Sequence, residues 1–253
     1  MNKTLKFLLI AACSLILPVA AQASEALQLD KAPLRFDNAS LQNGAKLFVN
    51  YCLNCHGASS VRYNRLRDIG LTEEQIRDNL MFTGEKVGDL MRTALRREDA
   101  KQWFGVVPPD LSVIARARSS ESGSGADWIY TYLRQFYRDD SRPTGWNNAL
   151  FPNVGMPNVL WALQGEQQAH FAEVKDEQGG VAKHLEKLDI AVPGKLTKDQ
   201  FDKEVADLVS FITWMGEPAQ VLRQQIGWWV LAVLSVLAVL SYALKRAFWK
   251  DVH

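Results

Sequence analysis

The sequence predicts a mainly α-helical protein with long loops and one transmembrane helix near its C-terminal end. Three observations lead to this prediction. Apolar residues recur at helical spacing while alternating strand patterns are sparse. Residues 139–158 are rich in Pro, Asn and Gly, which is the composition of a long loop. An unbroken apolar run extends from Ile226 to Leu244.

The expected helices are read from this spacing and from residues that commonly begin or end a helix. Ser40 is the expected N-cap of the first helix and Thr197 that of the last one before the apolar run. Pro218 should then break the chain. Residues 164–199 are polar and charged, and form either an insertion or a surface hairpin. Helical segments are expected at about 40–52, 72–82, 85–100, 127–137 and 197–215.

The apolar run is expected to anchor the protein in a membrane. It holds no charge over 19 residues, and at ~1.5 Å per residue it would span about 28 Å, close to a bilayer core. Aromatic residues lie near both of its edges, where membrane interfaces favour them. We expect the anchor over residues 223–245 and, because basic residues follow, a short cytoplasmic tail over residues 246–253. A buried core helix is the alternative.

Residues 1–23 are expected to be a secretory signal peptide. Two lysines precede an apolar stretch that ends in the small-x-small cleavage motif Ala21-Gln22-Ala23. A first transmembrane helix is the alternative, but the stretch is shorter than the ~20 residues that a span requires. Lipidation at Cys13 is disfavoured because the apolar run continues past it. Residues 24–222 would then form an exported domain.

The charge balance excludes one class of function and favours another weakly. The net charge of the whole chain is +1, whereas a nucleic-acid-binding protein is expected to be strongly basic. Between the signal peptide and the anchor, acidic residues slightly outnumber basic ones. This imbalance favours a basic protein partner.

The motif that carries chemistry is Cys52-Leu53-Asn54-Cys55-His56. Two thiols three positions apart on a helical turn lie on one side, where each can add to a haem vinyl group. The histidine that follows then reaches the iron as its proximal ligand. The sequence therefore predicts one covalently bound haem c at Cys52 and Cys55, with His56 as an iron ligand.

The motif has two other interpretations, a redox dithiol and a structural zinc site. A thioredoxin-like dithiol is expected between a strand and a helix, whereas this motif follows a helix. A structural zinc needs about four ligands, and the remaining histidines of the domain, His170 and His184, are far away in a polar segment. Both readings are weaker than haem attachment.

Met156 is the expected second axial ligand of the iron. It lies in the loop Asn153–Pro157, where Gly155 allows a close approach to the ring and the proline stiffens the backbone. The histidines named above are other options. The other methionines of the mature chain lie on expected helices, where core filling is the usual role; they are Met81, Met91 and Met215.

Two further contacts with a haem are expected. A proline carbonyl, from Pro108 or Pro109, would accept a hydrogen bond from the second ring nitrogen of His56. The haem propionates need cationic partners, and a guanidinium can hold a carboxylate in two parallel bonds. Arg116 and Arg118 follow the prolines closely enough to be candidates.

The chain resembles the cytochrome c1 family, the haem subunits of the cytochrome bc1 complex. The resemblance implies a class I cytochrome c-like core in which the helices near 40–52 and 200–215 cross. It also implies His56 and Met156 as axial ligands and Arg118 near a propionate. Beyond the haem motif it is carried by Pro108-Pro109-Asp110-Leu111-Ser112, Arg116-Ala117-Arg118, Asp127-Trp128, Gly155-Met156-Pro157, Asp207–Trp214, Glu217-Pro218 and Arg223.

The sequence departs from the family in three places. The extended proline run common after the axial methionine is missing after Met156, and residues 164–199 match the family poorly. The disulfide of some members cannot form, because the mature domain has no cysteine outside the haem motif. The form of the ligand loop and the role of residues 164–199 therefore stay open.

The resemblance implies a function of electron relay. The chain would take single electrons from a Rieske iron–sulfur protein and pass them to a soluble or anchored cytochrome c, beside cytochrome b, in a dimeric complex. Such a subunit transforms no substrate itself. The expected location is a bacterial inner membrane, with the haem domain in the periplasm. A stand-alone anchored cytochrome shuttle is the alternative, and a haem peroxidase or gas sensor is a third possibility.

Overall fold

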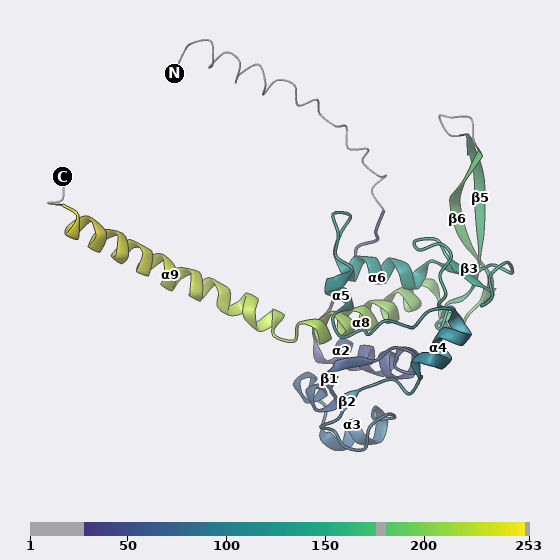
Figure 1. Ribbon diagram of the computed structural model, residues 1–253, viewed down its shortest axis with the longest axis horizontal. Coiled ribbons are helices and arrows are strands. Elements are labelled where there is room, and N and C mark those ends of the chain that lie inside the picture. Colours follow the sequence, from purple (N-terminus) through teal and green to yellow (C-terminus); the bar gives the residue numbers. More distant parts are fainter. Residues whose placement is uncertain (1–27, 176–180, 251–253) are drawn as a thin grey trace, which may run out of the picture.

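A computed structural model describes residues 28–175 and 181–250, and it is mainly helical, with one long helix leaving the folded domain (Figure 1). This architecture confirms the predicted fold class. The expected signal peptide, residues 1–23, lies outside the described residues. The elements in chain order are α2 (Asn38–Leu47), η1 (Phe48–Cys52), β1 (Ala58–Arg62), η2 (Tyr63–Ile69), α3 (Glu73–Asn79), β2 (Leu90–Met91), α4 (Arg97–Phe104), α5 (Ile114–Ala117), α6 (Gly125–Arg134), β3 (Phe136–Arg138), β4 (Trp146–Asn148), α7 (Trp161–Gln164), β5 (Gly165–Lys175), β6 (Val181–Pro193), α8 (Lys198–Gly216) and α9 (Gln220–Phe248).

The crossing of α2 with α8 organises the core. Gly44 of α2 lies against the backbone of Asp207 and against Cβ of Phe211, so any side chain at position 44 would collide with α8. The buried Asp207 carboxylate accepts hydrogen bonds from Arg35 and Asn43. These contacts bring two distant segments together in the arrangement that the resemblance implies.

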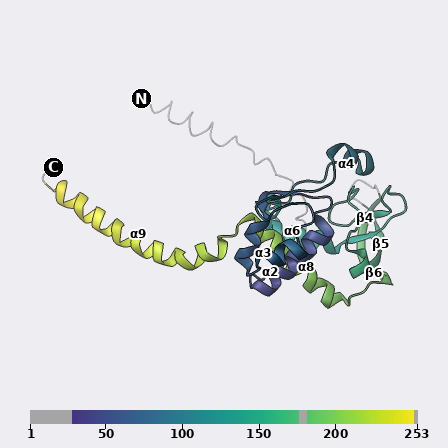
Figure 2. The ribbon, with the colours of Figure 1, turned by 90° about the horizontal axis from the view of Figure 1, so that it is seen from below.

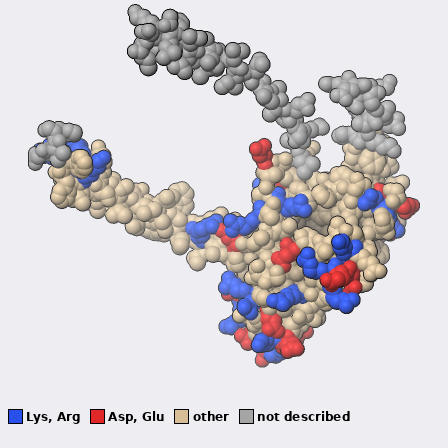
Figure 3. All heavy atoms as spheres, in the orientation of Figure 1, with Lys and Arg blue, Asp and Glu red and all other residues tan. Residues whose placement is uncertain are grey.

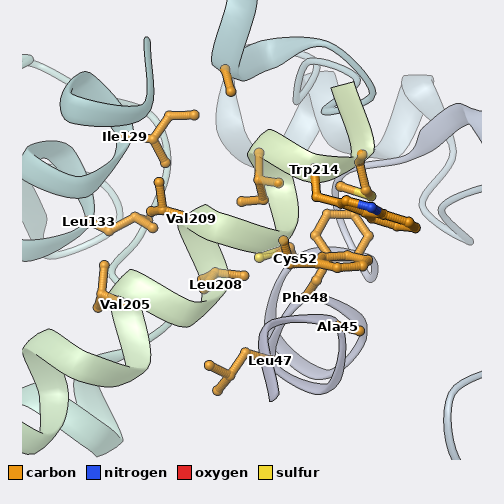
Figure 4. Packing of buried hydrophobic residues seen from close by; sticks show 14 of the residues in the cluster. Ala45, Leu47, Phe48, Cys52, Ile129, Leu133, Val205, Leu208, Val209 and Trp214 are labelled. Atoms are coloured by element: carbon orange, nitrogen blue, oxygen red, sulfur yellow. The ribbon is translucent and has the colours of Figure 1, made fainter. Parts of the chain in front are cut away.

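The remaining core lies on both sides of α8. Figure 4 shows α8 between η1, from which Phe48 and Cys52 point towards it, and α6, from which Ile129 and Leu133 point towards it. The ring of Phe48 packs at 5.6 Å from that of Phe211, measured between centroids. Because α8 has neighbours on both sides, most of its residues are buried.

The predicted cap of α8 is confirmed and that of α2 is wrong. Thr197 accepts a hydrogen bond from the amide of Gln200, whose side chain in turn accepts one from the Thr197 amide, a capping box. In α2 the N-cap is Asp37, which accepts from the amide of Ser40. Ser40 lies inside the first turn and is buried. It is not the cap, because its own amide is the group that the Asp37 carboxylate caps.

The predicted helix over 85–100 is wrong over residues 85–96, and only its last part is helical, as the start of α4. Residues 80–96 form turns and the short strand β2, which pairs with β1, and α4 begins only at Arg97. The cause is local: the Asp89 carboxylate accepts hydrogen bonds from the amides of Glu85 and Lys86, at 2.9 and 3.1 Å. An aspartate that binds nearby amides offers the backbone an alternative to the helix.

The segment 164–199, which the sequence left open as an insertion or a hairpin, contains a hairpin. Strands β5 and β6 pair antiparallel from Gly165 and Pro193 at the base to Lys175 and Val181 at the far end. Figure 1 shows the hairpin projecting from the domain on the side away from α9. Gly165 adopts a φ of 96°, and a Cβ there would collide with the backbone of Val192, so the hairpin base requires glycine.

Helix α9 is long and apolar enough to cross a membrane. It runs from Gln220 to Phe248, beyond both ends of the predicted anchor, and none of its residues is buried against the domain. In both views it extends away from the domain as one continuous helix (Figures 1 and 2). Its middle carries no charge, while basic side chains gather at its two ends (Figure 3). The break at Pro218 separates it from α8, as the sequence predicts.

The α2–α8 crossing gives a first testable prediction. Gly44→Ala should destabilise the domain by about 2 kcal/mol or more, because the added methyl group meets backbone that cannot move without separating the helices. Thermal unfolding followed by circular dichroism in detergent measures this. Gly88→Ala is the matched control, since a Cβ at that glycine meets nothing within 4 Å. Equal unfolding midpoints for the two variants would contradict the role given to Gly44.

Candidate haem site

The end of α2 presents the Cys-x-x-Cys-His motif. The helix widens after Leu47 into one π-helical turn, η1, closed by a hydrogen bond from the Leu53 amide to the Phe48 carbonyl, and this turn ends at Cys52. The amides of Cys55 and His56 both donate to the Cys52 carbonyl. The next turn therefore folds back, so that both thiols and the imidazole line one cavity.

The Cys52 thiol is buried, which raises its pKa to about 12, with a smaller contribution from the neighbouring Cys55. Cys55 is partly exposed, and burial raises the pKa of its thiol as well. Neither cysteine is in a disulfide. Both sulfur atoms are therefore neutral thiols at neutral pH, free to form thioether bonds.

The imidazole of His56 is oriented by a backbone carbonyl. Its Nδ1 lies 2.8 Å from the carbonyl oxygen of Pro109. Because a carbonyl can only accept, Nδ1 must carry the proton and donate it, which leaves the lone pair on Nε2 for a metal. Burial lowers the pKa of His56, against smaller opposing effects of Pro109 and Asp110, so the ring is neutral at neutral pH.

The turn that supplies this carbonyl is held by Asp110. Its carboxylate accepts hydrogen bonds from the amide and hydroxyl of Ser59 and from the amide of Ser112. The amide of Leu111 donates to the carbonyl of Gly57, at 2.7 Å. Burial alone would raise the pKa of Asp110, but the hydrogen bonds from Ser112 and Ser59 outweigh it and lower the pKa. The turn is thus tied to the residues just after His56.

Six of the residues for which a haem contact is predicted line one predominantly apolar cavity: Cys52, Cys55, His56, Pro109, Arg118 and Met156. Their neighbours come from the end of α2, the loop before α5, helix α6 and the loop after β4. The other lining residues are Tyr51, Phe104, Val106, Pro108, Leu111, Ile114, Trp128, Ile129, Tyr132, Leu133, Phe151, Asn153, Val154, Gly155, Pro157 and Ile212. Arg116, the second arginine considered, is exposed and does not line the cavity.

Among the methionines in the described part of the chain, Met156 is the one that lines the cavity. Met91 and Met215 are buried in the core, and Met81 packs against it. His170, a further option for the sixth ligand, lies on the β5–β6 hairpin, where its Nε2 is 3.2 Å from a carboxylate oxygen of Asp189. The side chain of His184 is not described.

Buried asparagines shape the loop that carries Met156. The side-chain oxygen of Asn148 accepts from the amides of Leu150 and Phe151, and its nitrogen donates to the carbonyl of Tyr132 on α6. The side-chain oxygen of Asn147 accepts from the amide of Asn153, at 2.8 Å. The buried hydrogen bond from Asn148 to the Tyr132 carbonyl fastens the loop to α6, and the others hold the backbone of the loop itself.

The residues present fit a haem by their chemistry. The cavity is lined mostly by apolar and aromatic side chains, which suit a flat apolar macrocycle. Two thiols and a neutral imidazole with a free Nε2 are the groups that attach a c-type haem and ligate its iron, and the thioether of Met156 could serve as the second axial ligand. The guanidinium of Arg118 supplies a cation at the cavity wall for a propionate.

The sequence does not single out two residues of the site: Tyr132, which lines the cavity, and Asn148, which holds the loop that carries Met156. Trp128, Tyr132 and Phe136 recur at four-residue spacing, so an aromatic face on one helix could have been read from the sequence. No local signal identifies Asn148, because its partners depend on how the loop folds onto α6.

The exposed apolar helix and the cavity with its thiols, imidazole and thioether together define a membrane-anchored c-type cytochrome. Comparison with known proteins specifies the family. The model of the cytochrome c1 family matches residues 28–252, and the chain belongs to this family. Membership makes it a haem c electron-transport subunit of the cytochrome bc1 complex in a respiratory chain.

The sequences of known relatives align with most or nearly all of this chain. A cytochrome c1 of Allochromatium vinosum is 46% identical over 250 residues, which cover 97% of this chain and 99% of the relative. A protein of Nitrosomonas europaea named ammonia monooxygenase gamma subunit is 47% identical over 253 residues, 99% of this chain and 100% of the relative. Cytochrome c1 of Rhodospirillum rubrum is 28% identical over 251 residues, 86% of this chain and 84% of the relative.

The asparagine-fastened loop gives a second testable prediction. Asn148→Ala should lower the free energy of unfolding by about 2–3 kcal/mol, because it leaves a buried carbonyl and two amides without partners. Thermal unfolding of the full chain measures the loss. Asn79→Ala, which removes an exposed asparagine on α3, is the control and should change the midpoint little. If both variants unfold alike, the loop does not depend on Asn148.

Proposed function

We propose that this chain carries one haem c, attached through thioether bonds to Cys52 and Cys55 and ligated by His56 and Met156, and that it relays single electrons. It takes them from a Rieske iron–sulfur protein and passes them to a soluble or anchored cytochrome c. No proton or group is transferred to a substrate at this subunit.

The observation that carries the proposal is the shared cavity. An oriented imidazole and a thioether line the same apolar space as the two thiols. A haem bound there supplies one-electron redox chemistry, and a histidine–methionine pair favours electron transfer at a raised potential over binding of external ligands. A peroxidase or a gas sensor would need an open sixth position, which the nearby thioether argues against.

The other residues hold and orient. The Pro109 carbonyl keeps the imidazole of His56 in one tautomer and one plane. Arg118 pairs with a propionate, and the apolar wall excludes water. Each of these contacts restricts motion around the iron, which suits a site that changes its charge without changing its ligands.

We assign the parts of the chain as follows. Residues 24–222 form an exported domain after removal of the signal peptide 1–23, residues 223–245 cross the membrane, and residues 246–253 form a cytoplasmic tail. The basic residues that follow the apolar run support this orientation through the positive-inside bias. The haem domain then lies in the periplasm of a bacterial inner membrane, where α9 packs beside cytochrome b in a dimeric complex.

Purification of the native membrane complex in mild detergent tests the proposed partners. Cytochrome b and a Rieske protein should purify together with this chain, and the chain should stain for haem. The haem should be reduced when quinol is added. A chain that purifies without cytochrome b would be a stand-alone shuttle. A chain that purifies with an ammonia-oxidising enzyme, as the name of the N. europaea relative suggests for that protein, would contradict the proposed partners.

Replacement of the proposed axial methionine gives a third prediction. Met156→Leu should lower the reduction potential of the haem by more than about 100 mV, and quinol should reduce it more slowly, because a thioether ligand favours the ferrous state. Potentiometric titration checks this. Met81→Leu is the matched control, since Met81 does not line the cavity. An unchanged potential in Met156→Leu would show that the ligand is another residue.

A further inference from the structure

One face of α6 carries two aromatic rings that lie almost parallel. The rings of Trp128 and Tyr132 are stacked, with centroids 4.8 Å apart and planes inclined by 14°. The ring of Phe136 meets Tyr132 edge-on at 5.0 Å. Residues four apart on a helix are neighbours on its surface, so α6 places the rings of Trp128 and Tyr132 next to each other.

The two stacked rings contact two of the residues proposed to bind a haem, Met156 at one end and Arg118 at the other. The hydroxyl of Tyr132 donates to Sδ of Met156 at 3.4 Å, within the range of a hydrogen bond to sulfur. The guanidinium carbon of Arg118 lies 4.4 Å from the centre of the Trp128 ring. The ring of Phe151 faces the same guanidinium at 5.8 Å. Arg118, Trp128, Tyr132 and Met156 thus form one continuous row of contacts along the cavity wall.

The row has little freedom to rearrange. Tyr132 is 8% exposed, and its ring packs against those of Trp128 and Phe136. Helix α6 begins in close contact with α5. Gly125, its first residue, lies so near the Ala115 carbonyl that a Cβ at this position would collide with it. The distance between Arg118, at the end of α5, and Trp128 is thereby set by backbone packing.

We propose that Trp128 and Tyr132 are positioning residues for the iron site: Trp128 holds the Tyr132 ring so that its hydroxyl donates to the Met156 sulfur, and this hydrogen bond raises the reduction potential. The proposal rests on the proposed function, since it concerns the same cavity. In this proposal neither Trp128 nor Tyr132 contacts the iron or a propionate. Both act through Met156, which is the proposed iron ligand.

The direction of the effect follows from charge. A thioether sulfur has two lone pairs, so one can bind iron while the other accepts a hydrogen bond from the phenol O–H. The hydrogen bond withdraws electron density from the sulfur and points the positive end of the O–H dipole at the metal. Both effects favour the ferrous state, which carries one positive charge fewer than the ferric state.

Tyr132→Phe removes the hydroxyl and keeps the ring, its stack on Trp128 and its edge contact with Phe136. The ratio of reduced to oxidised haem at a given potential should fall roughly two- to tenfold, the range of a single net hydrogen bond. The weak long-wavelength absorption of thioether-bound ferric iron should shift as well. Tyr130→Phe removes a hydroxyl from the same helix outside the cavity, and should change neither quantity.

Trp128→Phe tests whether the tryptophan acts through Tyr132. In the full chain, Tyr132→Phe should have a smaller effect on the potential when Trp128 is already replaced, because the hydroxyl is then no longer held towards sulfur. Effects that simply add would overturn the role of Trp128. An unchanged potential and absorption in Tyr132→Phe would overturn the proposal as a whole.

These outcomes are separable from failure of the proposed function. If the wild-type chain carries no covalently bound haem, shown by haem staining and by its mass, the proposed function fails and no potential can be measured. If haem is bound, Met156→Leu lowers the potential and Tyr132→Phe does not, then only the inference about Tyr132 and Trp128 is wrong.

Discussion

The contact on which the rest of the structure depends is the close crossing of α2 and α8 at Gly44. Because a glycine there lets the two backbones touch, α2 runs directly across α8, and the turn that ends it lies against α8 on one side. That turn carries Cys52, Cys55 and His56. Gly44 takes no part in the chemistry. Its position in the crossing nevertheless helps to place the two thiols and the imidazole on one side of the cavity.

The opposite walls of the cavity are loops, and loops need other means of support. Asp110 binds the amides around the proline turn, and Asn148 binds the loop that leads to Met156. Each side chain replaces hydrogen bonds that a helix or sheet would otherwise supply. Such networks are sensitive, because loss of one partner leaves several buried groups unsatisfied. The cavity therefore combines a rigid helical side with two loops held by single polar side chains.

Features that depend on neighbouring residues in the chain could be predicted, and features that depend on distant contacts could not. The Thr197 cap, the break at Pro218 and the apolar helix follow from local chemistry and were expected. The helix predicted over 85–100 shows the limit of local prediction. The composition of these residues suggested a helix, but the Asp89 carboxylate accepts hydrogen bonds from two nearby amides, and a turn forms instead. At the site, the haem motif and Met156 were recognised from spacing and loop composition, and remain predictions as ligands. The contact of Tyr132 with Met156 joins two elements 24 positions apart, and no single-sequence pattern reports it.

A site that relays electrons needs a cofactor that is held still in a dry environment and charged groups that set its potential. Apolar walls meet the first need but oppose the second, because a charge is costly where water is excluded. The arrangement around Arg118 resolves this conflict. Its guanidinium is covered by the faces of Trp128 and Phe151, which attract a cation while excluding water. The same Trp128 stacks on Tyr132, whose hydroxyl turns a neutral dipole towards Met156. Aromatic side chains thus line this cavity with apolar surface and at the same time hold a cation, Arg118, and a hydroxyl dipole, that of Tyr132, within it.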